Sequence, residues 1–318
     1  MNKFLRLTLT AVAVSVSAQL PGFAQVDEII KPGPEINEIS QATTLLVAAV
    51  SENGILCNGS GSLIAKDGDT CIGVTNAHVV DVGQNQNVGF VVRTADQAVH
   101  PVSDVYIFNQ EDLALVAFEC TQDYEPIPLA TYQLSPGQEV YLSGWPADSS
   151  PDGDTYDFVR QFTSGSISTV LDQPFWGYQI GYTNVTNRGM SGGQVLDTAG
   201  RLVAVHGLGA REDAGQIAAR LGVDESTAAE FADKTGFNYG IPVTTLLARA
   251  SQAGFNYPFE VVYTTPQPPA NGVVAQGDYV YEPDESDQVN FDNVLDNAGR
   301  LFDTIDAGAD LICRFVGC

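Results

Sequence analysis

The sequence carries a histidine, an aspartate and a serine whose local settings suit nucleophilic catalysis. They are His78 in Thr-Asn-Ala-His-Val-Val, Asp112 in Asp-Leu-Ala-Leu-Val and Ser191 in Gly-Met-Ser-Gly-Gly. A serine hydroxyl is a weak nucleophile until a neighbouring imidazole removes its proton. The imidazole in turn needs a carboxylate that fixes its tautomer and stabilises the imidazolium. These three residues are therefore a candidate catalytic set.

Each motif alone is more often structural. A glycine-rich run is usually a plain loop, a lone histidine between apolar residues is usually a core residue, and an aspartate can simply begin a strand. The joint occurrence favours catalysis, because the chain has only three histidines in all. Glu111 is a competing carboxylate, but Asp112 directly precedes the apolar run at residues 113–118 and is preferred.

The elements that would position these residues are short strands. Asp67-Gly68 lies between two strand-like runs and is a strong hairpin signal. Strand-like runs occur at residues 43–50, 60–65, 70–75, 88–93, 102–107 and 113–118, and again at 139–143, 159–170, 178–183, 194–196 and 202–205. Many short strands with glycine-rich turns predict an all-β sandwich or barrel.

Three segments depart from this strand pattern. Residues 214–220 and 225–234 are alanine-rich and predict a small helical insertion, with Asp224 as an N-cap. Residues 241–253 predict a helix with Pro242 in its first turn. Residues 257–318 form a separate tail, in which an acidic linker precedes an apolar periodicity over 289–305 that predicts a C-terminal helix.

The three motifs resemble those of the trypsin-like serine peptidases, in particular the short bacterial members. The segment Gly59-Ser60-Gly61-Ser62-Leu63-Ile64, with the histidine motif after it, is similar to the family's first hairpin and histidine loop. The chain order His, Asp, Ser is also that of chymotrypsin-like enzymes. The resemblance covers residues 42–250. It departs from the family at Met190, where Asp or Asn is common, and at Gln194, where Pro is common.

The resemblance implies two packed six-stranded antiparallel β-barrels, at about residues 42–125 and 133–250, within a peptidase domain at 42–256. It also implies that the backbone N–H groups of Gly189 and Ser191 form an oxyanion hole. Staphylococcal-type glutamyl endopeptidases carry a threonine and a histidine at the positions that match Thr186 and His206, which become candidate substrate-binding residues for a glutamate side chain. The alternative for His206 is a structural histidine inside the barrel.

The resemblance further implies one disulfide. In the family's first barrel, the strand before the histidine pairs with the strand after the aspartate, and this register brings Cys71 opposite Cys120. Cys57 has no family partner, while Cys313 and Cys318 are a second candidate pair. Because no close-spaced cysteine pair combines with a histidine, no metal site or other cofactor is expected.

The N-terminal region predicts export. Lys3 and Arg6 precede an apolar run at residues 7–18 that is too short to span a bilayer, so residues 1–24 are interpreted as a signal peptide and 25–41 as a leader or pro-segment. The protein would then be secreted or periplasmic, with no membrane association after signal cleavage. A net charge of −25 disfavours binding to nucleic acid and anionic lipid.

These observations predict a secreted serine endopeptidase that cleaves polypeptides through an acyl-enzyme, with a preference for glutamate before the cleaved bond. The alternatives are a catalytically silent binding protein with the same fold and an esterase on this scaffold. Trypsin-type zymogens mature when a new N-terminal ammonium pairs with an Asp just before the catalytic serine. Met190 cannot form that ion pair, so the serine loop is expected to be held by packing around its thioether.

Overall fold

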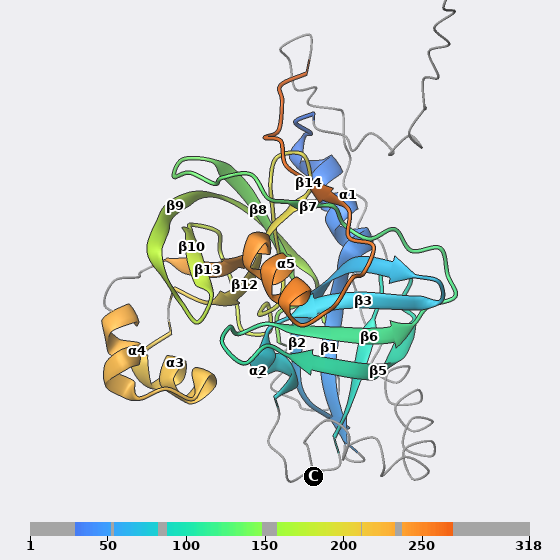
Figure 1. Cartoon of the computed structure of the whole chain (residues 1–318), viewed down its shortest axis with the longest axis horizontal. Helices are drawn as coiled ribbons and strands as arrows, with labels where there is room; N and C mark the ends of the chain where they lie inside the picture. The colour runs from blue at the N-terminus through green and yellow to red at the C-terminus, as the bar shows by residue number, and fades with distance from the viewer. Residues whose placement is uncertain are drawn as a thin grey trace, which may run out of the picture.

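Two antiparallel β-barrels make up most of the molecule (Figure 1). The computed structural model describes residues 29–51, 54–81, 88–147, 158–210, 212–232 and 237–269. The first barrel contains β1 (Thr44–Ser51), β2 (Gly54–Asp67), β3 (Thr70–Thr75), β4 (Gly89–Arg93), β5 (Val99–Ile107) and β6 (Ala114–Glu119). Its strand order is β1-β2-β3-β6-β5-β4, and pairing between β1 and β4 closes it.

The second barrel also has six strands. They are β8 (Glu139–Gly144), β9 (Gln161–Phe175), β10 (Tyr178–Tyr182), β11 (Gln194–Leu196), β12 (Leu202–Leu208) and β13 (Asn238–Pro242). The order is β11-β8-β9-β10-β13-β12, and pairing of β11 with β12 closes the ring. Two short strands extend this sheet in parallel: β7 (Leu129–Ala130) pairs with β12, and β14 (Val261–Val262) pairs with β7. The predicted pair of six-stranded barrels is therefore confirmed.

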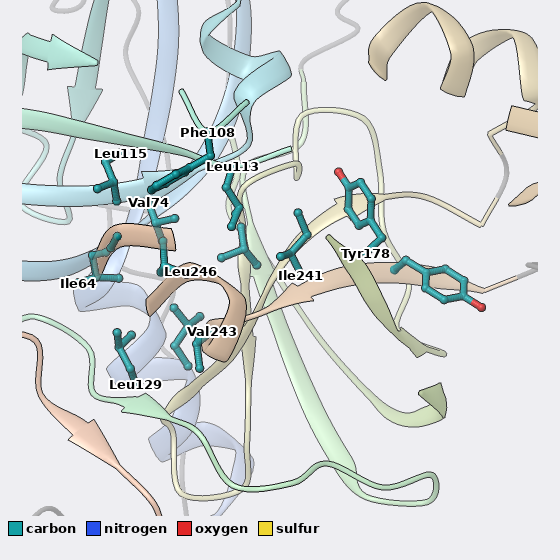
Figure 2. Packing of buried hydrophobic residues seen from close by; sticks show 14 of the residues in the cluster. Ile64, Val74, Phe108, Leu113, Leu115, Leu129, Tyr178, Ile241, Val243 and Leu246 are labelled. Carbon is teal, nitrogen blue, oxygen red and sulfur yellow. The ribbon is translucent and has the colours of Figure 1, made fainter. Parts of the chain in front are cut away.

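A shared apolar core lies where the barrels meet (Figure 2). Ile64, Val74 and Leu113 of the first barrel belong to the same buried cluster as Ile241 of the second barrel and Leu246 of the helix that follows it. Burial of such a side chain contributes about 2 kcal/mol. The interface thus fixes the two halves of a site that draws residues from both barrels.

The helices agree with the sequence in part. The predicted insertion is present as α3 (Ala214–Leu221) and α4 (Glu225–Ala232), and the Asp224 side chain accepts the Thr227 N–H as an N-cap would. The predicted start of the later helix was wrong: α5 runs Val243–Gln252, because Ile241 and Pro242 close β13. Pro242 has an extended ψ of 146° and is the N-cap of α5.

One helix was not predicted. Within the expected leader, α1 (Gly33–Thr43) buries Ile36 and runs directly into β1. Arg160, itself buried, holds this helix to the second barrel by donating to Ser40 Oγ at 3.0 Å and to Asn37 Oδ1 at 2.8 Å. The polar composition of the segment reflects this buried hydrogen-bond network.

The expected disulfide between Cys71 and Cys120 is confirmed, with the two Cα atoms 5.7 Å apart. The register differs from the expected one, because β3 and β6 pair Cys71 with Phe118 and not with Cys120. Cys120 lies two residues beyond Phe118, so the disulfide joins the strands diagonally. Cys57 is a free, exposed thiol. The signal peptide, the tail helix at 289–305, Cys313 and Cys318 lie outside the described residues. Among the helices that the structure describes, none has the length and apolar character needed to cross a bilayer.

Candidate active site

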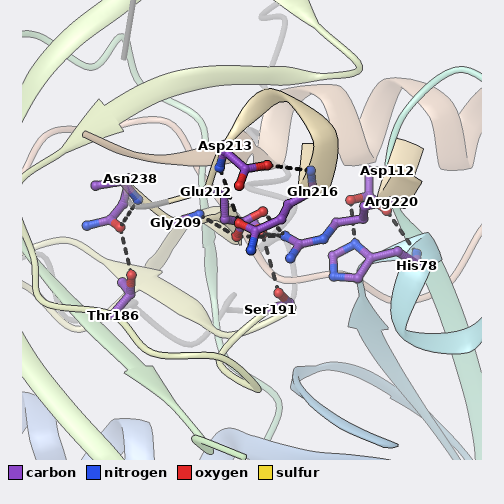
Figure 3. Close-up of polar contacts among 12 residues, drawn as sticks. His78, Asp112, Thr186, Ser191, Gly209, Glu212, Asp213, Gln216, Arg220 and Asn238 are labelled. Carbon is purple, nitrogen blue, oxygen red and sulfur yellow. Dashed lines mark hydrogen bonds and ion pairs between the residues drawn. The ribbon is translucent and has the colours of Figure 1, made fainter. Parts of the chain in front are cut away.

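Asp112 and His78 form a close pair in the first barrel. His78 lies in the short helix α2 (Ala77–Val80), and Asp112 lies two residues before β6. His78 Nδ1 is 2.6 Å from Asp112 Oδ2, and the His78 backbone N–H donates to Asp112 Oδ1 at 2.9 Å (Figure 3). Asn76 Nδ2 donates to the Asp112 carbonyl at 2.8 Å. The carboxylate therefore fixes the imidazole with Nδ1 protonated, which leaves Nε2 as a base.

A third donor reaches the same carboxylate from the second barrel. The hydroxyl of Tyr178, at the start of β10, donates to Asp112 Oδ2 at 2.5 Å. Burial raises the pKa of Asp112, but the charge of His78 and the hydrogen bonds from His78 and Tyr178 outweigh it and lower the pKa overall. Burial and the Asp112 charge raise the pKa of Tyr178 well above its ordinary value, so the hydroxyl keeps its proton and donates.

Replacing Tyr178 with phenylalanine should destabilise the protein by about 2 kcal/mol at pH 7, because a buried carboxylate loses a donor. The pKa of Asp112 is depressed in the folded state. The contribution of the Tyr178 hydroxyl is thus present above the unfolded pKa of about 4 and is lost as the pH falls through the folded value. Urea unfolding at pH 7 and pH 3 should show a difference from wild type that shrinks on acidification.

Tyr141→Phe is the matched control for Tyr178→Phe. The Tyr141 hydroxyl also donates to a carboxylate, Glu139 Oε1 at 2.8 Å, but near the surface. Its loss should cost less than about 1 kcal/mol. An equal effect of both substitutions at pH 7 would contradict a special role for Tyr178.

Ser191 lies in a tight loop between β10 and β11. Gly189 and Gly192, on either side of it, have φ values of +89° and +87°, which other residues rarely adopt. A Cβ on Gly192 would also lie 1.9 Å from the Ser60 carbonyl oxygen. The Ser191 hydroxyl donates to the Gly207 carbonyl at 3.3 Å, and in the described structure no hydrogen bond joins it to His78. Such bonds are often long or unformed without substrate.

Ser60 of the first barrel holds this loop on both sides of Ser191. Its N–H donates to the Ser191 carbonyl at 2.7 Å, and its hydroxyl donates to the Gly189 carbonyl at 2.9 Å. Ser60 thus binds the carbonyl groups of Gly189 and Ser191. The N–H groups of the same two residues donate to no partner in the part of the chain that the structure describes. Two unpaired N–H groups beside a serine hydroxyl are the donors that a developing oxyanion needs.

The buried side chain of Met190 anchors the loop that carries Ser191. Its side chain is fully buried, and its sulfur lies 3.3 Å from the Asn187 N–H, which points to it. These contacts support the expectation that packing around this thioether holds the loop. Gln194, the other departure from the family, is buried and donates to Thr43 Oγ1 at 2.8 Å while accepting from Thr44 Oγ1 at 3.0 Å. It links the strand after Ser191 to the end of α1.

His206 lies on β12 behind the serine loop. Its backbone braces that loop, accepting from the Gly192 N–H at 2.7 Å and donating to the Gly193 carbonyl at 2.9 Å. Its Nδ1 is 2.7 Å from the Tyr182 hydroxyl, and the ring is buried. Burial, reinforced by the charges of Arg220 and His78, lowers the pKa of His206 to about 3, so the imidazole is neutral at pH 7.

Thr186 lies on the side of the site away from His78 (Figure 3). Its hydroxyl donates to Asn238 Oδ1 at 2.6 Å, and that oxygen also accepts the Ala210 N–H at 2.9 Å. Thr186 and His206 therefore both have partners within the protein. Among the described residues, no group of three His, Cys, Asp or Glu side chains is arranged to hold a metal ion.

Sequence reasoning missed Tyr178 and Ser60. Each acts across the interface between the barrels, and Tyr178 is separated from Asp112 by 66 residues. The only sequence signal was the position of Ser60 inside the Gly-Ser-Gly-Ser run that was already assigned to the first hairpin.

Comparisons with known proteins agree with this fold. Residues 59–205 match the family model of the trypsin-like peptidase domain. A crystal structure of the serine endoprotease from Yersinia pestis has a TM-score of 0.50 and 18% identity, covering 71% of this chain and 68% of that chain. A crystal structure of Deg5 has a TM-score of 0.48 and 21% identity, covering 68% of this chain and 90% of that one. No curated protein matches the chain.

The matched region begins before the histidine motif and ends within β12, so it contains all three candidate residues of the triad. At 18% identity the Yersinia pestis structure supports the fold alone, while the family model supports the activity class. The chain therefore contains a trypsin-like peptidase domain over residues 59–205, and this match supports a serine endopeptidase activity.

Proposed function

We propose that this protein hydrolyses polypeptides through a triad of His78, Asp112 and Ser191. The observation that carries the proposal is the buried Asp112 carboxylate, which holds His78 Nδ1 at 2.6 Å and leaves Nε2 for the serine. Ser191 Oγ attacks the peptide carbonyl as His78 takes its proton, and His78 then gives that proton to the leaving amine. Water repeats the sequence on the acyl-enzyme and releases the acid.

The unpaired N–H groups of Gly189 and Ser191 would stabilise the tetrahedral intermediate. Removal of one such donor typically costs about 3 kcal/mol in the transition state. In this mechanism Ser191 Oγ turns from the Gly207 carbonyl toward His78 when substrate binds. A substrate that fills the space beside Gly207 would favour this rotation.

A fluorophosphonate probe tests this assignment directly. The wild-type protein should be labelled on Ser191 alone, and digestion of a denatured protein mixture should yield new peptide termini that mass spectrometry can map. Labelling without any peptide hydrolysis would favour the esterase alternative. Absence of both labelling and hydrolysis would favour a catalytically silent binding protein.

We further propose a preference for glutamate before the cleaved bond, with Thr186 and His206 among the substrate-binding residues. A neutral imidazole and a hydroxyl can both donate to a carboxylate. Here the Thr186 hydroxyl and His206 Nδ1 are engaged with Asn238 and Tyr182. A bound glutamate side chain would exchange those bonds for its own.

Replacing His206 with alanine should lower the ratio of kcat/KM for matched glutamate and glutamine peptides by about 10-fold, the lower end of the worth of a hydrogen bond to a charged group. His100→Ala is the control, because His100 is a buried first-barrel histidine that contacts Thr94 and Tyr124. Abundant cleavage after Lys or Arg by the wild type would contradict the glutamate preference itself.

We also propose that the protein is exported. The Cys71–Cys120 disulfide supports this, since such bonds persist in oxidising compartments and are rare in the cytosol. The predicted signal peptide at residues 1–24 is the second support. N-terminal sequencing of the protein from the culture medium or periplasm would locate the processing site.

Activity should not depend on one defined N-terminus. Met190 fills its site with an apolar side chain, so a new ammonium would find no carboxylate there. The first described residues are tied elsewhere, with the Ile30 N–H on the Gln267 carbonyl and the Lys31 N–H on the Thr198 carbonyl. Forms that begin at Gln25 and forms with several extra residues should have equal kcat/KM. Loss of activity on adding a single residue would contradict the argument.

A further inference from the structure

The helical insertion brings an arginine to the nucleophile. Arg220, in the last turn of α3, donates from Nη1 to the Gly207 carbonyl at 2.9 Å. The Ser191 hydroxyl donates to the same carbonyl oxygen. A guanidinium and the candidate nucleophile therefore share one acceptor, and Figure 3 shows the arginine reaching from its helix toward Ser191 and His78.

The helix that presents Arg220 is firmly placed. Its N-terminus has a capping box formed by Asp213 and Gln216, and its C-cap is Gly222 in the left-handed conformation. Ile217 and Leu221 are buried in the core that the two barrels share. These contacts fix the direction from which the Arg220 side chain approaches the site.

Of the three guanidinium nitrogens of Arg220, only Nη1 donates to other residues among those that the structure describes. Nη1 is 2.8 Å from Glu212 Oε1, besides its bond to Gly207, and Oε1 also accepts the Gly209 N–H at 2.9 Å. Nε and Nη2 donate to no other residue that the structure describes. The Arg220 side chain keeps 18% of its surface exposed. Arg220 is thus held at one end, with donors left for a ligand.

The charges around Ser191 favour an anionic ligand for those donors. His206 is neutral and faces Tyr182, and Asp112 is buried with His78 and Tyr178 as partners. Glu212 is the carboxylate that contacts Arg220, and it is already paired. A carboxylate next to the scissile bond would find a charged donor in Arg220, and guanidinium–carboxylate bonds are stronger than those from a neutral imidazole.

We propose that Arg220 is a specificity-determining residue, whose free guanidinium nitrogens bind the acidic side chain of a polypeptide substrate beside the bond that Ser191 cleaves. The inference rests on the proposed function and deepens it, since it adds a charged donor to Thr186 and His206. It assigns the helical insertion a role in substrate selection. Glu212 orients Arg220 and also competes with the substrate carboxylate, so its removal strengthens the preference.

Two substitutions with opposite expected effects test this proposal. The readout is the ratio of kcat/KM for two peptides that differ only in glutamate or glutamine before the cleaved bond. Arg220→Gln should lower the ratio by about 10- to 100-fold, the worth of a charge-assisted bond, while changing cleavage of the glutamine peptide by less than about threefold. Glu212→Gln should raise the ratio a few-fold. If the ion pair between Arg220 and Glu212 were purely structural, both substitutions would change this ratio in the same direction.

Arg188→Gln is the charge-matched control. Arg188 is an exposed arginine three residues before Ser191, so its loss changes the local field by the same unit charge. It should leave the ratio within about twofold of wild type. An equal fall in the Arg188 and Arg220 variants would overturn the proposal in favour of a general field effect.

Labelling of Ser191 by a fluorophosphonate separates this proposal from the proposed function. A wild-type protein that is labelled and cleaves peptides, but does not prefer glutamate over glutamine, would overturn the inference alone. If Arg220→Gln and Arg220→Lys each accelerate cleavage of the glutamate and glutamine peptides by the same factor, Arg220 obstructs the site and does not select the substrate. The double variant Arg220→Gln/Glu212→Gln controls for misfolding, because it leaves neither member of the ion pair as an unpaired charge. It should still show the lowered ratio.

Discussion

Replacing Ser191 with alanine is expected to abolish peptide hydrolysis and leave the fold intact. The hydroxyl is the nucleophile of the proposed mechanism, and loss of such a group lowers kcat by about 10⁶-fold. Its structural contribution is small, because the side chain is partly exposed and makes one long hydrogen bond to Gly207. The loop keeps its backbone contacts to Ser60. Peptide kinetics and a thermal unfolding curve on the same preparation measure both effects.

Ser103→Ala is the matched control for this substitution. The Ser103 hydroxyl also donates to a backbone carbonyl, that of Ala117 at 3.0 Å, and lies on β5 of the first barrel. Both variants should unfold within about 1 kcal/mol of wild type. The Ser103 variant should retain full activity. Near-normal activity of the Ser191 variant would end the serine-peptidase assignment for this site.

The sequence predicted the parts of the site that depend on local pattern. The triad candidates lie in short motifs whose strands, turns and glycines could be recognised residue by residue. The glycine conformations at Gly189 and Gly192 follow from the same local chemistry. The disulfide could be predicted from the pairing of two strands, although the observed register pairs Cys71 with Phe118, two residues before Cys120.

The missed residues act through contacts between distant parts of the chain. Tyr178 and Arg220 each lie on an element that was predicted, but their side chains meet Asp112 and Gly207 only after the barrels and the insertion have packed. Helix α1 was missed for a related reason. Its polar residues looked like a solvated leader, yet Asn37 and Ser40 are partners of the buried Arg160. Local composition does not reveal which polar groups become partners in a core.

Replacing Asp112 with asparagine should lower kcat by about 10⁴-fold. Both carboxylate oxygens accept from donors: Oδ1 from the His78 N–H, and Oδ2 from His78 Nδ1 and the Tyr178 hydroxyl. An asparagine can offer only one acceptor oxygen. If its amide group takes the Oδ2 position, it opposes two donors and favours the His78 tautomer that cannot act as base through Nε2. If the amide takes the Oδ1 position, it opposes the His78 backbone N–H.

Glu111→Gln provides the control that distinguishes the two neighbouring carboxylates. Glu111 pairs with Arg249 on α5, away from His78. Its loss should therefore reduce kcat by no more than a few-fold, although the partly buried Arg249 loses its ion-pair partner and stability falls by about 1 kcal/mol. Steady-state kinetics of both variants at pH 7, with fluorophosphonate labelling of Ser191, measure the contrast. A larger loss of kcat in the Glu111 variant would assign the orienting role to Glu111, because only the carboxylate that holds His78 can control the basicity of Nε2.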